Sequence, residues 1–177
     1  MTDTSALYEP PIYTFRVRLL DGGYAPPNAR DIWREIEVAA NQVLAELGDA
    51  IPLAFDFDLE HMWAFYLTGR AWDEEGAYNI DDPEVDAVAI RDLPLPGEAG
   101  RKEFLYIFDF GDEWHFGIRL VRTSPAVDLA ADYPRVVASH GEAPPQYPGA
   151  AAWEEEWDEE LDDADREEGD DALPEER

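Results

Sequence analysis

A regular alternation of apolar and polar residues around a short turn constrains the fold of this chain more than any other feature. The sequence FLYIFDFGDEWHFGIRLVR, residues 104–122, places an aromatic or aliphatic residue at every second position on both sides of Gly111 and Asp112. Side chains at this spacing lie on one face of a β-strand. The pattern therefore predicts an antiparallel hairpin with one buried face.

The side chains also indicate a register for this hairpin. A three-residue loop pairs Phe110 with Trp114 and collects the apolar side chains on one face, whereas a two-residue loop mixes aromatic and charged groups. We therefore expect the three-residue loop, with Gly111 supplying a positive φ where one is needed. In this register Asp109 faces His115 on the other side of the sheet.

The rest of the sequence predicts further strands and a helix. Period-two or apolar runs indicate strands at residues 13–19, 32–38, 61–68, 87–93 and 135–138. Leu44, Leu47, Ile51 and Phe55 have helical spacing after Asn41, which is expected to cap the helix, and they form its inward face. A proline within a helix removes a hydrogen bond, so Pro52 predicts a kink or a break near Ala50.

These elements together predict an α+β domain over residues 1–150. We expect a single, mostly antiparallel sheet of five or six strands, with one or two helices packed on one face. The following 27 residues, 151–177, hold fifteen acids and two arginines, and a segment of that charge is expected to be largely disordered. Trp153, Trp157 and Leu161 would nevertheless share one stripe of a short helix over residues 152–162.

Charge and composition exclude several classes of function. Thirteen basic residues against 42 acidic ones give a net charge of −29, which opposes direct binding to nucleic acid or anionic lipid. The absence of cysteine excludes disulfides, thiolate nucleophiles and zinc–cysteine sites. No run approaches the ~20 apolar residues that span a bilayer, and the amino end resembles no targeting signal, so we expect a cytoplasmic protein.

The kind of acidity also suggests a source. Lys102 is the one lysine beside twelve arginines, and acid excess with few lysines is expected of a salt-loving organism. A GC-rich genome, which favours arginine and alanine codons, is the alternative explanation.

Histidine and aspartate residues of the predicted sheet supply the candidate catalytic cluster. His61, Asp109 and His115 could act as acid and base or bind a divalent ion, because two imidazoles and a carboxylate suit both roles. The alternative is that each histidine hydrogen-bonds to a nearby carboxylate. Since no third fixed ligand accompanies the histidines, we expect neither a metal nor a cofactor.

Three arginines are predicted to lie on one face of the sheet. Arg16 and Arg18 alternate along the strand at residues 13–19, and Arg34 lies in the strand at 32–38. The cluster could mark an anion site, but the many acids nearby favour cross-strand ion pairs.

Several segments, taken in order, resemble the plasmid pRiA4b ORF-3-like family, whose members are also described as passenger proteins of insertion elements. The matching stretches include YTFRVRL (13–19), DIWREIEV (31–38), FDFDLEHMWAFYL (55–67), FLYIFDFGDEWHFGIRL (104–120) and YPRVVASHGEAPPQYPG (133–149). The most specific piece is the strand that ends in DFGD and is followed by a tryptophan. The resemblance implies a compact α+β domain and a plasmid or mobile-element context, with no demonstrated reaction.

Three functions are compatible with these observations. The first is a non-enzymatic protein-interaction module, which would bind an unidentified partner through Asp112 and Trp114 of the hairpin and through Trp153, Trp157 and Leu161 of the tail. The second is an acidic decoy that mimics DNA and binds a basic protein. The third is a small metal-dependent or acid–base enzyme that uses His61, Asp109 and His115. The sequence does not indicate an oligomeric state.

Overall fold

A computed structural model describes residues 10–97, 102–125 and 131–147 of the chain. The chain divides into two units, Met1–Pro144 and Pro145–Arg177. All of the helices and strands described below belong to the first unit. In the second unit the described residues are 145–147, where the side-chain amide of Gln146 donates to the Tyr147 hydroxyl at 3.0 Å.

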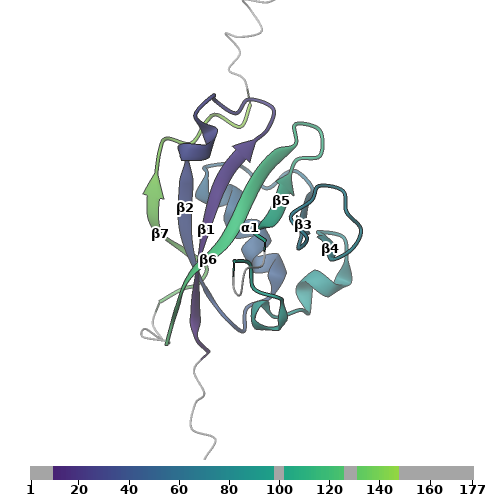
Figure 1. Cartoon of the computed structure of the whole chain (residues 1–177), viewed down its shortest axis with the longest axis vertical. Helices are drawn as coiled ribbons and strands as arrows, with labels where there is room; N and C mark the ends of the chain where they lie inside the picture. The colour runs from purple at the N-terminus through teal and green to yellow at the C-terminus, as the bar shows by residue number, and fades with distance from the viewer. Residues whose placement is uncertain (1–9, 98–101, 126–130, 148–177) are drawn as a thin grey trace, which may run out of the picture. The chain divides into compact units, whose positions relative to one another are not determined.

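Seven antiparallel strands form one sheet in the order β4-β3-β5-β6-β1-β2-β7 (Figure 1). The strands are β1 (Ile12–Asp21), β2 (Trp33–Ala39), β3 (Trp63–Tyr66), β4 (Ala77–Asn79), β5 (Phe104–Phe108), β6 (Trp114–Ser124) and β7 (Arg135–His140). The helices are α1 (Leu44–Ala54) and the short 3-10 turns η1 (Ala29–Asp31), η2 (Pro83–Asp86) and η3 (Ile90–Asp92). The predicted α+β class is confirmed, whereas the predicted number of five or six strands is too low.

The sheet differs from the prediction in two segments. Residues 87–93 do not form the predicted strand, and Ile90–Asp92 form the 3-10 turn η3. Ile90 and Arg91 donate their backbone N–H groups to the carbonyls of Gln42 and Ala40, both at 2.9 Å. These bonds attach the segment to the turn before α1, and one isolated bridge joins Val43 to Ala89. Residues 77–79, for which no strand was predicted, form the short edge strand β4, which pairs with β3.

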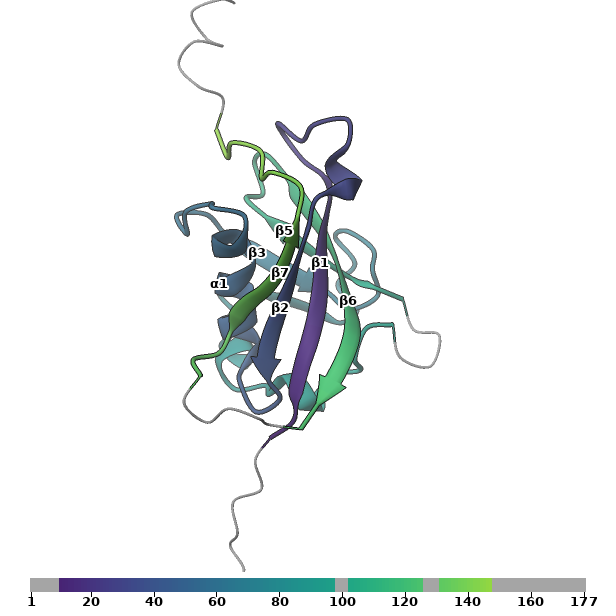
Figure 2. The ribbon, with the colours of Figure 1, turned by 90° about the vertical axis from the view of Figure 1, so that its left-hand side faces the viewer.

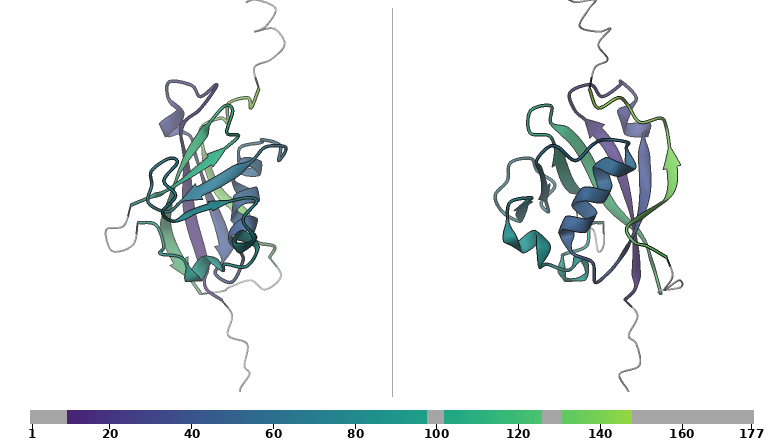
Figure 3. Two further views of the ribbon diagram at one scale, coloured as in Figure 1. Left: turned by 90° about the vertical axis from the view of Figure 1, so that its right-hand side faces the viewer. Right: turned by 180° about the vertical axis from the view of Figure 1, so that it is seen from behind.

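Helix α1 covers one face of the sheet. It lies on the side turned away from the viewer of Figure 1 and in front of the strands in Figure 3, right. Its buried residues Leu44, Leu47 and Ile51 pack with the odd-numbered apolar residues of β1 and the even-numbered residues of β5 and β6 in one core. The opposite face, here called the open face, carries a second, smaller cluster that includes Tyr66 and Leu105.

The beginning and end of α1 both differ from the prediction. The helix begins at Leu44, and the carboxylate of Glu46 accepts the N–H of Val43 at 2.8 Å, so Asn41 is not its cap. The expected break near Ala50 is also absent, because α1 continues through Pro52 to Ala54.

A side chain from the sheet compensates for Pro52. Proline has no N–H to donate to the carbonyl four residues earlier, which belongs to Gly48. The buried hydroxyl of Tyr106 on β5 donates to this carbonyl instead, at 2.8 Å. Gly48 itself permits the close contact, because a Cβ there would lie 2.4 Å from the indole of Trp63 on β3. The helix is therefore bonded to the sheet at the point where its own ladder is interrupted.

This bond leads to a double-mutant test. Tyr106→Phe should lower the free energy of unfolding by about 1–2 kcal/mol, because it leaves the buried Gly48 carbonyl without a donor. In a Pro52→Ala background the loss should be smaller, since the introduced alanine can donate its own N–H. Urea unfolding of the four proteins measures both costs. An equal cost of Tyr106→Phe in the two backgrounds would contradict the compensation.

Tyr106 also predicts a pH dependence. Burial, and then the charge of Asp49, raise the pKa of Tyr106 well above its ordinary value near 10. Above pH ~10 the unfolded chain releases this proton while the folded chain retains it, so stability falls with rising pH, by at most about 1.4 kcal/mol per pH unit. Denaturant unfolding between pH 9 and ~11 should show a smaller slope for Tyr106→Phe than for the parent. Identical slopes would rule out this contribution.

Candidate functional site

The hairpin between β5 and β6 has a longer loop than expected. Phe108 pairs with Trp114, so the loop spans residues 109–113, and the predicted pairing of Phe110 with Trp114 is wrong. Phe108 and Trp114 lie in the main core, on the predicted face. Phe110 packs instead against the smaller cluster on the open face, so the face predicted for this residue is wrong. Ile107, not Asp109, is opposite His115.

The side chain and backbone of Asp109 account for the longer loop. Asp109 has a φ of 55°, and its Oδ1 accepts the N–H groups of Gly111 at 2.9 Å and Asp112 at 3.4 Å. Its own carbonyl accepts the N–H of Glu113, whose φ is 50°. Aspartate tolerates this left-handed conformation because its short side chain bonds locally. The positive φ expected at Gly111 is therefore found at Asp109 and Glu113.

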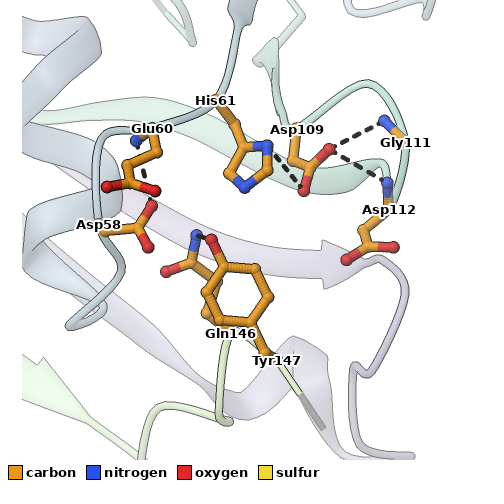
Figure 4. Close-up of polar contacts among 8 residues, drawn as sticks. All are labelled: Asp58, Glu60, His61, Asp109, Gly111, Asp112, Gln146 and Tyr147. Carbon is orange, nitrogen blue, oxygen red and sulfur yellow. Dashed lines mark hydrogen bonds and ion pairs between the residues drawn. The ribbon is translucent and has the colours of Figure 1, made fainter.

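The other oxygen of Asp109 contacts a histidine. Oδ2 lies 3.3 Å from Nδ1 of His61, which precedes β3 (Figure 4). The backbone N–H of Asp109 donates to the carbonyl of Met62 at 2.8 Å, and the His61 ring meets Phe108 edge-on at 5.9 Å. Asp109 thus fixes the turn with one carboxylate oxygen and orients His61 with the other.

His115 has a different carboxylate partner. Its Nε2 is buried and lies 3.3 Å from Oε2 of Glu113, without the alignment of a hydrogen bond. His61 and Asp109 are therefore brought together, while the ion-pair contact of His115 is to Glu113. In residues 10–97, 102–125 and 131–147, no group of three or more His, Asp or Glu side chains could hold a metal ion.

The loop of the hairpin also contacts Trp72, an aromatic residue that was not predicted to belong to the site. Trp72 contacts Phe110 of the loop and Tyr66 of β3, both edge-on, with ring centroids 5.3 Å and 6.0 Å away. Half of its surface remains exposed, and its φ is 60°. The signal available in the sequence is a lone tryptophan in an acidic segment between Gly69 and Gly76.

Polar contacts organise the loop that carries Trp72. The carboxylate of Asp73 accepts from the Thr68 hydroxyl at 2.9 Å and from Nε of Arg70 at 2.8 Å. The bonds from Arg70 and Thr68 lower the pKa of Asp73, and the Arg70 bond raises the pKa of that arginine. Two side chains before the exposed indole, Thr68 and Arg70, are therefore bonded to the carboxylate that follows it.

The residues expected to contact a partner lie in different environments. Trp114 is fully buried, so its ring packs in the core and presents no surface to a partner. Asp112 is partly exposed at the tip of the hairpin. Trp153, Trp157, Leu161 and the expected helix over 152–162 lie outside the described residues.

The three arginines divide between the two faces of the sheet. Arg16 binds Glu35 on the neighbouring strand β2 at 2.6 Å, which is the cross-strand ion pair expected. Arg18 binds Glu103, which precedes β5, at 3.2 Å. Arg34 is 7% exposed and lies on the helix side, where its guanidinium donates to backbone carbonyls that include that of Ala54, at 2.9 Å. Burial lowers the pKa of Arg34, and the charge of Asp56 opposes this shift.

The fold and sequence have known relatives. An uncharacterised protein of Sinorhizobium fredii, y4hQ, is 28% identical over 118 residues, which are 65% of this chain and 58% of that protein. This chain therefore spans less than two thirds of the length of that curated relative. A crystal structure of a protein of unknown function, MM3350 from Methanosarcina mazei Go1, has a TM-score of 0.60 and 25% identity and covers 94% of both chains.

No helix in the described part of the chain is long and apolar enough to cross a membrane.

The sequence model of the family described as "Plasmid pRiA4b ORF-3-like protein" matches residues 12–174. That match includes both the hairpin at 104–124 and the segments that carry His61 and Trp72. The chain belongs to the plasmid pRiA4b ORF-3-like family.

Proposed function

We propose that this protein is a non-catalytic interaction module that binds a protein partner through the surface around the β5–β6 loop. We define this hairpin surface by Trp72, Phe110 and Asp112. The observation that carries the proposal is the half-exposed indole of Trp72, held against Phe110 in a loop that is bonded internally.

Such an indole has the physical properties of a binding hot spot. Tryptophan is enriched among residues that dominate binding energy, since one ring buries a large apolar area. A loop fixed before binding loses less conformational entropy when the partner docks. The bonds to Asp73 and the edge-on contacts with Tyr66 and Phe110 supply this pre-organisation.

The charge of the chain favours a basic partner. A net charge of −29 attracts basic proteins over long range and repels acidic ones. The acidic-decoy function shares this attraction, but it does not require a specific aromatic contact. The two functions therefore differ in how much they depend on Trp72.

Substitution of Trp72 tests the proposal. Full-length protein with Trp72→Ala should bind the partner captured by the parent at least about 30-fold more weakly, as expected of a hot-spot tryptophan. Leu53→Ala is the matched control, because Leu53 on α1 is 55% exposed and lies outside the hairpin surface. Affinity capture from the source organism at its native salt, followed by titration of the captured protein, measures both.

Equal affinity of Trp72→Ala and the parent would reject the hairpin surface. If binding also fell steeply with salt and followed the number of acidic residues, the decoy function would be favoured. Thermal unfolding of both variants controls for folding, and each variant should keep a single cooperative transition.

One observation supports a second candidate, an acid–base or metal-dependent enzyme. The Asp109 carboxylate orients the His61 ring through Nδ1, which is how a general base is commonly held. His115, the third expected member, has Glu113 as its ion-pair contact. This separation of partners makes the enzyme the weaker candidate.

Metal content distinguishes this candidate. We expect purified full-length protein dialysed against Zn²⁺, Mn²⁺ or Mg²⁺ to retain less than one equivalent of metal, and His61→Ala to retain the same amount. Elemental analysis after gel filtration measures the stoichiometry. One equivalent in the parent, lost in His61→Ala and kept in His140→Ala, would support a metal site at His61.

A further inference from the structure

The open face of the sheet contains a cleft lined with arginines, which shares no residue with the hairpin surface. Its volume is about 320 Å³, and four arginines line it, against two carboxylates, Asp31 and Glu103. The arginines are Arg16, Arg18, Arg30 and Arg119. A chain with 13 basic residues and 42 acidic ones thus gathers four of the basic residues in one concave site.

The strand register places two of these arginines directly opposite each other. Arg16 on β1 pairs with Arg119 on β6. Like charges directly opposite each other on neighbouring strands destabilise a sheet, and the carboxylate of Glu35 offsets the charge of Arg16 alone. In β1 the neighbouring Arg18 is opposite Gly117, which adds no side chain to the floor of the cleft.

Two of the arginines are held in place by contacts within the protein. The guanidinium of Arg16 binds Glu35 at 2.6 Å and lies 4.4 Å from the ring centroid of Trp33. That of Arg18 binds Glu103 at 3.2 Å. Trp33 in turn stacks on His140 of β7, with ring centroids 5.7 Å apart, so one wall of the cleft is built from packed rings.

The other two arginines have positive charge to offer a ligand. Arg30 and Arg119 are exposed, and neither forms an ion pair with any residue in the part of the chain that the structure describes. Arg30 comes from η1 at the end of the β1–β2 connection, and Arg119 comes from β6. They therefore approach the cleft from two different elements.

We propose that this cleft binds a small phosphorylated compound with at least two negative charges. Guanidinium groups bind the oxygens of phosphate in a bidentate manner, and several arginines around one cleft suit a ligand of multiple charge. The volume fits a small molecule and not a folded partner. Arg30 and Arg119 bind the ligand directly, while Arg16, fixed by Glu35 and Trp33, completes the charged wall.

Titration of the full chain with pyrophosphate tests the proposal. Calorimetry at constant low ionic strength, set with NaCl, should give saturable binding at one site. Arg119→Gln should weaken this binding by about tenfold or more, because it removes one charge-assisted bidentate contact. The double substitution of Arg30→Gln and Arg119→Gln should abolish it.

Arg122→Gln is the matched control. Arg122 lies on β6, as Arg119 does, but it binds Glu37 at 3.1 Å and does not line the cleft. Its replacement by glutamine changes the net charge of the protein by the same amount as Arg119→Gln. Its affinity should stay within about twofold of the parent. No saturable binding by the parent, or equal weakening in Arg119→Gln and Arg122→Gln, would overturn the proposal. Circular dichroism of each variant confirms folding, and Trp72→Ala, which alters the hairpin surface, should bind pyrophosphate like the parent.

Discussion

The close contact of α1 with the sheet at Gly48 is the constraint on which the other parts depend. Any side chain at this position would collide with the indole of Trp63, so the helix can lie on β3 only with glycine there. The contact brings the Gly48 carbonyl to the Tyr106 hydroxyl, which supplies the donor that Pro52 lacks. Strands β3 and β5 are thereby bonded to or packed against the helix. His61 lies just before β3, and Asp109 directly follows β5.

The two faces of the sheet carry different kinds of side chain. The helix side is a continuous aromatic and aliphatic core, and its contents follow the alternation of β1, β5 and β6. The open face is divided: an apolar cluster around Tyr66, with Trp72 against that residue, occupies the β3–β5 side, and the arginine cleft occupies the β1–β2–β6 side. The proposed interaction through Trp72 and the proposed anion binding at Arg119 therefore depend on different residues, and mutation can test them separately.

The sequence predicted those features that repeat along the chain and failed where a single local bond decides. The alternation of Phe104 to Phe108 and the spacing of Leu44, Leu47 and Ile51 predicted the strands, the helix and their buried faces correctly. The loop length was wrong because the Asp109 carboxylate binds two backbone N–H groups, a gain that periodicity does not show. Likewise, the position of Arg34 follows from its place opposite Val17, which points to the helix. The contacts of Trp72 with Phe110 and the lining of the arginine cleft join residues that are distant in sequence. No local sequence pattern predicts that such residues lie together.

The exposed position of strand β7 affects the tendency of the protein to aggregate. This strand is the outermost one beside β2 (Figure 2), and Val136 and Val137 on it are 48% and 40% exposed. An edge strand with apolar side chains can pair with the edge of another molecule, a route to aggregation that proteins commonly block with charge. Here the net charge of −29 supplies mutual repulsion. Because salt shortens the range of this repulsion to about 10 Å at 0.1 M, the colloidal stability of the protein becomes a function of ionic strength.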